Sequence, residues 1–405
     1  MKILQINKFY YRRGGADHHF LDLCDLLESK GHLTVPFSMH DPRNLKSLYG
    51  KYFVSNVEFF ENRGVANALK RARMFYSCEA NKKLKKLLKK EKPELAHVHL
   101  LYHQISPTIL PVLKKAGIPV VMTIHDWKMV CPNYTLYTQG HLCTQCRAHK
   151  YYNCLQYRCI KNTVCGSAMA SAVAYYHHWR GYYEKYVDLY IAPSQFVKDM
   201  LVKVFAWPES KIEVLAHFVD PSIQILKKAS PLPTWPRFAY VGRLSEEKGI
   251  KRLVHYWHKH EIFDELEIIG DGPLKQYLAD YIEDHGLAQI KLRGRLEHDK
   301  IYKELSSFTA VVVPSLVYET FGLTAIEAFA RGVPVVANAV GALPELVNKS
   351  KAGILFSWHK GGLRQALDQA QDQKYRQSAI EYINCSHGAG EYYEKLMGIY
   401  SKIVK

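Results

Sequence analysis

Short apolar runs alternate with longer amphipathic segments along the first half of the chain. A helical period covers His18–Lys30, and Ser194 stands where it would cap a further helix. The apolar runs have the length of buried strands: Lys2–Ile6, Leu95–Leu100, Pro119–Ile124, Leu189–Ser194 and Lys211–Leu215. Strands that alternate with helices in this way predict a parallel sheet covered by helices.

The pattern breaks between residues 223 and 236, where three prolines in the last ten positions prevent any regular element. A second series follows it: Phe238–Arg243, Leu266–Gly270, Ala310–Pro314, Pro334–Ala337, Gly353–Phe356 and a helical pattern at Gly390–Lys405. We therefore expect an α/β protein of two doubly wound, Rossmann-like domains, 1–222 and 237–385, with a linker at 223–236. A C-terminal helix at 386–405 is expected to pack back on the first domain. In such a fold a ligand binds between the domains, at the carboxyl ends of the strands.

The charge of the chain narrows the choice of partner. Of its 405 residues 48% are hydrophobic, which supplies cores for two or three domains, and the formal net charge is +17. That charge favours an anionic partner such as nucleic acid, acidic lipid or a phosphorylated substrate. The longest apolar run, near 310–317, is too short to span a membrane, and the N-terminus has no signal-peptide pattern. We therefore expect a cytoplasmic protein.

Much of the positive charge is concentrated in one segment, residues 82–92, which contains seven lysines. Leu84, Leu87 and Leu88 share one face of the predicted helix, and the basic, apolar stretch Leu69–Tyr76 precedes it. One interpretation is a solvated surface helix with a thin buried stripe. Another is a helix that lies on an anionic membrane. A DNA-binding helix is the third, although no nucleic-acid fold motif accompanies it.

The segment around Gly322 carries the most chemical information. A strand runs into a tight turn there, and the free N–H groups of the helix that follows suit a phosphate. Glu319 precedes this helix and Glu327 lies eight positions later, where each carboxylate can accept hydrogen bonds from sugar or ribose hydroxyls. Arg243 and Lys248, after the first strand of the same half, supply cations for a departing diphosphate.

At these residues the chain resembles the retaining glycosyltransferases of family 4, which have the GT-B fold. The motifs that carry the resemblance run through nearly the whole chain: Gly14-Gly15, Ile191-Ala192-Pro193-Ser194, Gly242-Arg243-Leu244 with Lys248-Gly249, Gly270-Asp271-Gly272-Pro273, and Glu319 with Phe321-Gly322-Leu323 and Glu327.

The resemblance implies a role for each matched residue. Arg243 and Lys248 would hold the nucleotide diphosphate, Glu319 the donor sugar and Glu327 the ribose. The backbone of Phe321, Gly322, Leu323 and Thr324 would cradle phosphate and sugar. From the first domain, His125 would touch the donor sugar, and Gly14 and Gly15 would let the first loop approach the phosphates. No catalytic metal is expected, because the chain has no Asp-x-Asp pair and its cations would replace the ion.

Six of the nine cysteines fall between positions 131 and 165. Cys143 and Cys146 have the spacing of a zinc knuckle, and Cys154 and Cys159 follow closely, so these four are the candidate ligands of a structural zinc. Cys131 is an alternative to Cys154 or Cys159. Some polysaccharide-making relatives resemble the chain in this cysteine-rich insertion, 131–165. The other interpretation is a set of thiols that bind no metal.

Together these patterns predict a retaining transferase that moves a hexose from a UDP- or GDP-linked donor to an acceptor hydroxyl. The expected acceptor is an envelope polysaccharide or lipid-linked glycan, with the protein peripheral on the cytoplasmic face of an anionic membrane and no nucleic-acid partner. Two alternatives stay open: a zinc-stabilised, basic nucleic-acid-binding protein, and a sugar epimerase of the GT-B fold.

Overall fold

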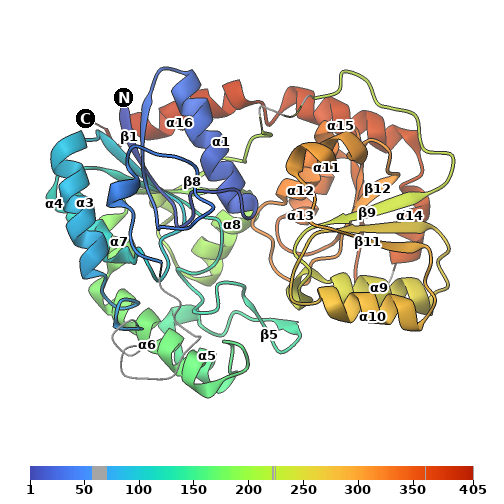
Figure 1. Ribbon diagram of the computed structural model, residues 1–405, viewed down its shortest axis with the longest axis horizontal. Helices are drawn as coiled ribbons and strands as arrows, with labels where there is room; N and C mark the ends of the chain where they lie inside the picture. The colour runs from blue at the N-terminus through green and yellow to red at the C-terminus, as the bar shows by residue number, and fades with distance from the viewer. Residues whose placement is uncertain (57–70, 221–222, 224, 361, 405) are drawn as a thin grey trace. The chain divides into compact units, whose positions relative to one another are not determined.

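A computed structural model describes residues 1–56, 71–220, 223, 225–360 and 362–404 of the chain (Figure 1). It divides into two compact units. Unit 1 comprises 1–139, 144–216 and 392–405, and unit 2 comprises 140–143 and 217–391. Parts of two sequence predictions, Leu69–Lys70 of the basic stretch and Gln224 of the linker, lie outside the described residues. The described part of 223–236 contains no helix or strand.

Unit 1 is built on a six-stranded parallel sheet with the order β2-β1-β3-β4-β7-β8. Its strands are β1 (Lys2–Ile6), β2 (Leu33–Phe37), β3 (Leu95–Val98), β4 (Val120–Thr123), β7 (Leu189–Ala192) and β8 (Ile212–Val214). Five of these match the predicted apolar runs within two residues at each end. The sixth, β2, was not predicted, because Pro36 interrupts its apolar run; proline is tolerated in a strand at the edge of a sheet, where β2 lies.

The helices of unit 1 are α1 (Gly15–Ser29), α3 (Cys78–Glu91), α4 (Leu110–Lys115), α5 (Tyr152–Gln156), α6 (Val164–Arg180), α7 (Tyr182–Tyr186) and α8 (Gln195–Asp199), with the two-residue strand β5 (Tyr137–Thr138). In Figure 1 most helices of unit 1 lie around this sheet, whereas α5 and α6 lie at the bottom of the unit. Ser194 caps α8 as predicted, because its side chain accepts a hydrogen bond from the Val197 N–H at 3.3 Å. Of α16 (Ala389–Ser401), the part from Tyr392 onward belongs to unit 1, where Tyr400 bonds His97 and Lys402 pairs with Glu213.

Unit 2 contains a second six-stranded parallel sheet, in the order β11-β10-β9-β12-β13-β14. Its strands are β9 (Arg237–Val241), β10 (Glu265–Ile269), β11 (Ile290–Gly294), β12 (Ala310–Val313), β13 (Val335–Asn338) and β14 (Gly353–Phe356). The two-residue strand β6 (His141–Leu142) lies outside this sheet. The helices are α9 (Ile250–Lys259), α10 (Lys275–Asp284), α11 (His298–Leu305), α12 (Leu323–Ala330), α13 (Leu343–Ser350), α14 (Leu363–Gln369) and α15 (Gln373–Cys385). In Figure 1, α9 and α10 lie on one face of this sheet and α11, α12 and α13 on the other.

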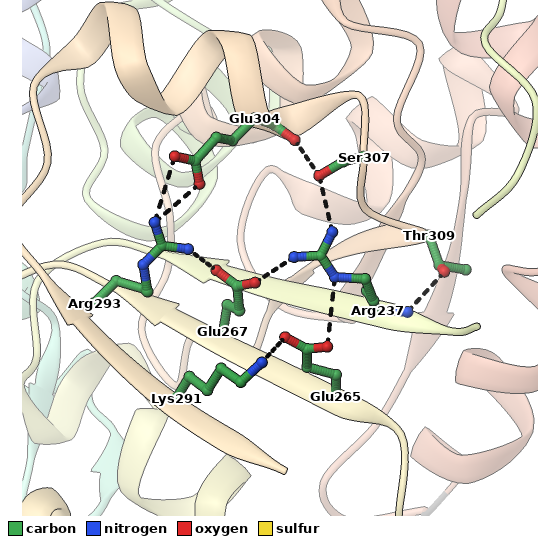
Figure 2. A network of polar contacts seen from close by, with 8 residues as sticks. All are labelled: Arg237, Glu265, Glu267, Lys291, Arg293, Glu304, Ser307 and Thr309. Atoms are coloured by element: carbon green, nitrogen blue, oxygen red, sulfur yellow. Dashed lines mark hydrogen bonds and ion pairs between the residues drawn. The ribbon is translucent and has the colours of Figure 1, made fainter. Parts of the chain in front are cut away.

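A network of charged side chains explains why β11 was not predicted. Lys291 and Arg293 alternate with apolar residues in this edge strand and point to the same face as Glu265 and Glu267 of β10 (Figure 2). Glu267 is almost fully buried and accepts hydrogen bonds from Arg237 and from Arg293, each at 2.5 Å. The charges of β11 are therefore matched across the sheet by carboxylates, a partner that the local sequence does not show.

No helix in the part of the chain that the structure describes is long and apolar enough to cross a membrane.

Candidate active site

The loops after β9 and β12 lie at the point where the chain order of the unit 2 sheet changes direction. β9 is flanked by β10 on one side and β12 on the other, so connections leave the two strands in opposite directions. In open parallel sheets this switch point leaves room for a ligand at the carboxyl ends of the strands. Arg243 and Lys248 follow β9, and Glu319 follows β12.

Lys248 and Glu319 are brought together from these two loops. The Nζ atom of Lys248 donates to Oε1 of Glu319 at 2.7 Å, and the Ser315 hydroxyl donates to the same oxygen. Burial by itself would raise the pKa of Glu319, but the Lys248 ion pair and both hydrogen bonds outweigh it and lower the pKa. Glu319 is therefore ionised at neutral pH. Within the described residues both hydrogen bonds fall on Oε1, which leaves Oε2 able to accept from a hydroxyl.

Two glycines hold the backbone on either side of this ion pair. Gly249 has φ +75°, and a Cβ there would lie 2.0 Å from the Pro314 carbonyl oxygen. Gly341 has φ +67°, and a Cβ there would lie 2.4 Å from the backbone nitrogen of Glu319. Both the left-handed conformation and the close approach require glycine. The positions of Lys248 and Glu319 are thus set by backbone packing that no larger residue permits.

The helix α12 begins next to Glu319, as the sequence predicts. Its N-cap residue is Gly322, with φ +106°, and no side chain caps the first turn. Phe321 is buried against the rings of His217 and His387, at centroid distances of 5.0 and 5.6 Å. Leu323 and Thr324 are partly exposed at the helix start, and Glu327 lies in the same helix. The first N–H groups of α12 therefore form a site suited to an anion.

The turn Gly270–Pro273, which the sequence identifies only as a motif, supports the loop that carries Arg243. A Cβ at Gly270 would lie 1.8 Å from the carbonyl oxygen of Gly242, and one at Gly272 2.4 Å from that of Leu244. The Leu244 N–H also donates to the Asp271 carbonyl oxygen at 3.0 Å. Arg243 is exposed at this loop, and its side chain makes no hydrogen bond or ion pair with the residues that the structure describes.

The other predicted site residues, Gly14, Gly15 and His125, belong to unit 1. Gly14 is the extended N-cap of α1, and a Cβ there would meet nothing within 4 Å, so the loop surface at this point is open. His125 follows β4, and its Nε2 atom lies 2.9 Å from Nδ1 of His99. Gly14 and His125 lie in the loops that follow β1 and β4, and Gly15 is the first residue of α1.

Two models of known families match successive parts of the chain. A model described as "Glycosyltransferase Family 4" matches residues 13–223, and one described as "Glycosyl transferases group 1" matches residues 223–384. The chain belongs to glycosyltransferase family 4. It is a glycosyltransferase with the GT-B fold.

Individual relatives of this family 4 glycosyltransferase extend the comparison. An uncharacterized glycosyltransferase of Methanocaldococcus jannaschii is 31% identical over 180 residues, which span 40% of this chain and 45% of the relative. HepE of Anabaena, solved with UDP and glucose, has a TM-score of 0.66 at 17% identity, with all of both chains covered. The lipopolysaccharide outer core galactosyltransferase WaaB has a TM-score of 0.60 at 18% identity, also over both whole chains. The chain thus spans less than half the length of its M. jannaschii relative, while it shares its fold with the two solved structures along its whole length.

Three of the four predicted zinc ligands of this glycosyltransferase lie together: Cys146 and Cys154 are buried in one cluster, and Cys159 packs against them. Cys143 is partly exposed. Burial raises the pKa of Cys131 to about 11, partly offset by hydrogen bonds from backbone N–H groups. Among the described residues, no three His, Cys, Asp or Glu side chains are placed to hold a metal ion. A structural zinc in this segment stays a prediction.

Proposed function

We propose that this glycosyltransferase transfers a hexose from a nucleoside-diphosphate sugar, UDP- or GDP-linked, to an acceptor hydroxyl with retention at the anomeric carbon. The observation that carries the proposal is the Lys248–Glu319 ion pair beside the uncapped start of α12. A carboxylate that keeps one oxygen for a hydroxyl, next to a cation and a row of N–H groups, suits a sugar joined to a diphosphate. The similarity to HepE, solved with UDP and glucose, favours UDP as the nucleotide.

The negative charge of the leaving group explains why the proposed site contains cations. As the bond from the sugar to the diphosphate breaks, negative charge develops on the phosphate oxygens. Arg243, Lys248 and the first N–H groups of α12 would stabilise that charge most in the transition state. The chain contains no Asp-x-Asp pair to bind a divalent ion, so these groups would take its place.

The same set of groups supports retention without a covalent intermediate. Glu319 is held by Lys248 and Ser315, and we assign it to sugar hydroxyls rather than to attack on the anomeric carbon. The departing phosphate would take the proton of the acceptor hydroxyl on the same face of the sugar. The nuclear magnetic resonance spectrum of the product decides the stereochemistry: an α-linked product from an α-linked donor is expected, and a β-linked product contradicts retention.

A donor screen tests the substrate class. Thermal unfolding is measured with UDP, GDP, ADP, UDP-glucose and GDP-mannose, followed by transfer assays with the best donor. We expect one uridine or guanosine nucleotide to raise the melting temperature, and Glu319→Ala and Arg243→Ala to lose at least about 10²-fold in kcat/KM. If no nucleotide stabilises the protein, or if both variants keep full activity, the proposal is wrong.

For the acceptor, we propose a glycan carried on a membrane lipid, of the kind used in envelope polysaccharide synthesis. Helix α3 buries Leu84, Leu87 and Leu88 and exposes lysines along its other side, and α4 packs beside it with Lys114 and Lys115 exposed. Such a face is attracted to anionic lipid by about 1 kcal/mol per lysine near the surface. The similarity to WaaB, a lipopolysaccharide galactosyltransferase, favours the same class of acceptor.

Vesicle sedimentation tests this membrane contact. A variant with Lys85, Lys86, Lys89 and Lys90 changed to Gln is compared with a control in which Lys275, Lys303, Lys360 and Lys374, exposed lysines of unit 2, are changed to Gln. At low salt we expect the wild type and the control to bind vesicles that contain phosphatidylglycerol, and the α3 variant to lose most binding. Equal loss in both variants means that only net charge matters, and the assignment to α3 then fails.

A further inference from the structure

Two lysines at the carboxyl edge of the unit 1 sheet have ammonium groups without a carboxylate partner. Lys8 follows the end of β1 by two positions and Lys128 follows the end of β4 by five, and β3 lies between these two strands. Loops that leave the carboxyl ends of neighbouring parallel strands lie at the same edge of a sheet. Both lysines are half-buried, and neither forms an ion pair with a residue that the structure describes.

The two ammonium groups also make few hydrogen bonds. Nζ of Lys128 donates to the carbonyl oxygen of Pro132 at 2.6 Å, whereas Nζ of Lys8 donates to none of the described residues. An ammonium group has three N–H donors, so most of these donors have no acceptor in the described chain. Burial lowers the pKa of Lys8 to about 8, and the positive charges of Arg13 and Lys128 contribute to this effect. The two lysines are therefore close enough to repel each other.

Two carboxylates lie near these lysines but bond other groups. Asp17 of α1 accepts a hydrogen bond from the side-chain amide of Asn7 at 2.9 Å. Asp126 accepts from the Tyr102 hydroxyl at 2.5 Å and from the backbone N–H of Lys128 at 2.9 Å. Burial raises the pKa of each carboxyl group to about 6, although these hydrogen bonds oppose the rise. The carboxylates at this edge are thus held by neutral donors and not by the lysine ammonium groups.

A third cation lies beside Lys8 on the loop that follows β1. Nζ of Lys8 is 5.0 Å from the centroid of the Phe9 ring, and the guanidinium carbon of Arg13 is 4.5 Å from the same centroid. Phe9 is buried and packs edge-on against Tyr11, so the ring is a fixed support for both cations. The Arg13 side chain is exposed and makes no hydrogen bond or ion pair with the residues that the structure describes.

This arrangement of charges is costly unless another molecule completes it. A charged group that is partly removed from water loses solvation, and only a partner of opposite charge or several hydrogen bonds can compensate for the loss. Groups with such shifted pKa values gather at functional sites. Because the nearby carboxylates bond elsewhere, the cations are available to an anion that does not belong to the chain.

We propose that Lys8 and Lys128, with Arg13 beside them, bind an oxyanion of the acceptor substrate, either a phosphate group or the carboxylate of an acidic sugar. This assignment rests on the proposed function, because a transferase binds a second substrate and the donor groups Lys248 and Glu319 belong to unit 2. The place suits a ligand, since β1 lies at the switch point of the unit 1 sheet, between β2 and β3. Lysines act as point charges with rotatable donors, which suits either kind of oxyanion.

Anion binding is measured in the full-length protein saturated with UDP, or with the nucleotide that the donor screen identifies. The probes are inorganic phosphate and glucuronate, titrated at low ionic strength by isothermal titration calorimetry. We expect at least one probe to bind the wild type, and Lys8→Met and Lys128→Met each to weaken that binding about tenfold. Binding of phosphate alone assigns the site to a phosphate group, and binding of glucuronate alone assigns it to an acidic sugar. If neither probe binds, the proposal is wrong.

Matched controls separate a site from the effect of net charge. Lys46→Met and Lys115→Met remove the same charge from exposed positions of unit 1. These two variants should keep the affinity of the wild type within about twofold, because exposed charges at a distance are screened. Equal weakening in all four variants would mean that only the total charge matters, and the assignment to Lys8 and Lys128 would then fail.

Thermal unfolding without any ligand distinguishes a binding role of Lys8 from a structural one. Methionine keeps most of the length of the lysine side chain but carries no charge, so Lys8→Met removes a half-buried charge that has no partner in the described chain. We expect its melting temperature to rise by roughly 2 °C or more. A lower melting temperature would show that the ammonium group stabilises the fold, and this result overturns the proposal.

The nucleotide arm separates the proposal from the proposed function. If Lys8→Met weakens UDP as much as it weakens phosphate, or if UDP displaces the phosphate, these cations bind the donor diphosphate; the proposal is then overturned while the proposed function stands. If no nucleotide binds the wild type, the proposed function is wrong and the assignment to an acceptor fails with it. Loss of phosphate binding in the two variants would still establish an anion site in that case.

Discussion

Replacement of Gly341 by alanine is expected to disable the site without removing any functional group. A Cβ at this position would lie 2.4 Å from the backbone nitrogen of Glu319 and 2.7 Å from its carbonyl oxygen. The Glu319 carbonyl also accepts the Ala342 N–H at 2.9 Å, so the two loops cannot separate without the loss of that hydrogen bond. The new methyl group must therefore displace Glu319.

The size of the effect has two parts. Alanine at a φ of +67° costs roughly 1 kcal/mol of conformational energy, and relief of the overlap costs about 1–3 kcal/mol more. A shift of about 1 Å in a group that positions substrate reduces turnover roughly 10²-fold. We thus expect Gly341→Ala to lower the free energy of unfolding by about 2–4 kcal/mol and kcat/KM by about two orders of magnitude.

Gly286 provides the matched control in the same unit. It has φ +60°, and a Cβ there would meet nothing within 4 Å, so Gly286→Ala has the conformational cost without the overlap. The measurements are urea unfolding of both variants and transfer activity with the donor found in the screen. Gly286→Ala should lose roughly 1 kcal/mol and no activity. If the two variants lose equal stability and equal activity, the close approach of Gly341 to Glu319 does not position the carboxylate.

Three further predictions follow from the charges and thiols. Glu267→Gln should destabilise unit 2 by about 1–3 kcal/mol in urea unfolding, because two arginines then face a neutral group. Glu304 is partly exposed, so the control Glu304→Gln should cost less than about 0.5 kcal/mol. Equal costs of the two substitutions would contradict the role of Glu267 at the centre of the network. Lys248→Met leaves burial as the main influence on Glu319, so the pKa of Glu319 should rise above its ordinary value. The variant should be roughly 1–2 kcal/mol less stable than the wild type at pH 7, because the pair is partly exposed, and this difference should shrink as the pH falls to 4 and Glu319 is protonated. A difference that is constant with pH would exclude the ion pair as its cause. Metal analysis of protein purified without chelators tests the cysteine-rich segment, where one zinc per chain confirms the zinc prediction and none rejects it.

The fold could be predicted from the sequence wherever a strand is buried on both faces. Runs such as Ala310–Val313 are apolar throughout, and their length and spacing were sufficient to identify them. Of the strands in the two six-stranded sheets, β2 and β11 were missed, and both lie at sheet edges, where one contains a proline and the other depends on charges from its neighbour. Edge strands are determined by their tertiary partners, and these are not encoded within a local window.

The candidate site was likewise predicted only in part from the sequence. Glu319 and Lys248, 71 positions apart, were both assigned to one site from their motifs, and the structure shows that the two side chains are in contact. The supporting residues were not found, because Gly341 and Ser315 have no distinctive pattern of their own. His97 and His99 lie in the predicted strand Leu95–Leu100, but His99 bonds Gln5, 94 positions away, and His97 bonds Tyr400, 303 positions away. A functional side chain can thus be recognised from the local sequence, whereas the residues that orient it can be identified only once the fold is known.

The sheet of unit 2 has the proposed site at one end and the charges around Glu267 towards the other, so the effects of substitutions in the two places can be measured separately. In unit 2 the buried charges centred on Glu267 begin at Arg237, the first residue of β9, whereas Lys248 and Glu319 follow the last residues of β9 and β12. Both sets contain ion pairs, but among the described residues only the second keeps a carboxylate oxygen for a hydroxyl. Loss of the Glu267 network should therefore change unfolding alone and leave KM for the donor intact. Loss of Lys248 should change both, because the same ammonium group compensates a buried carboxylate and would face the departing diphosphate.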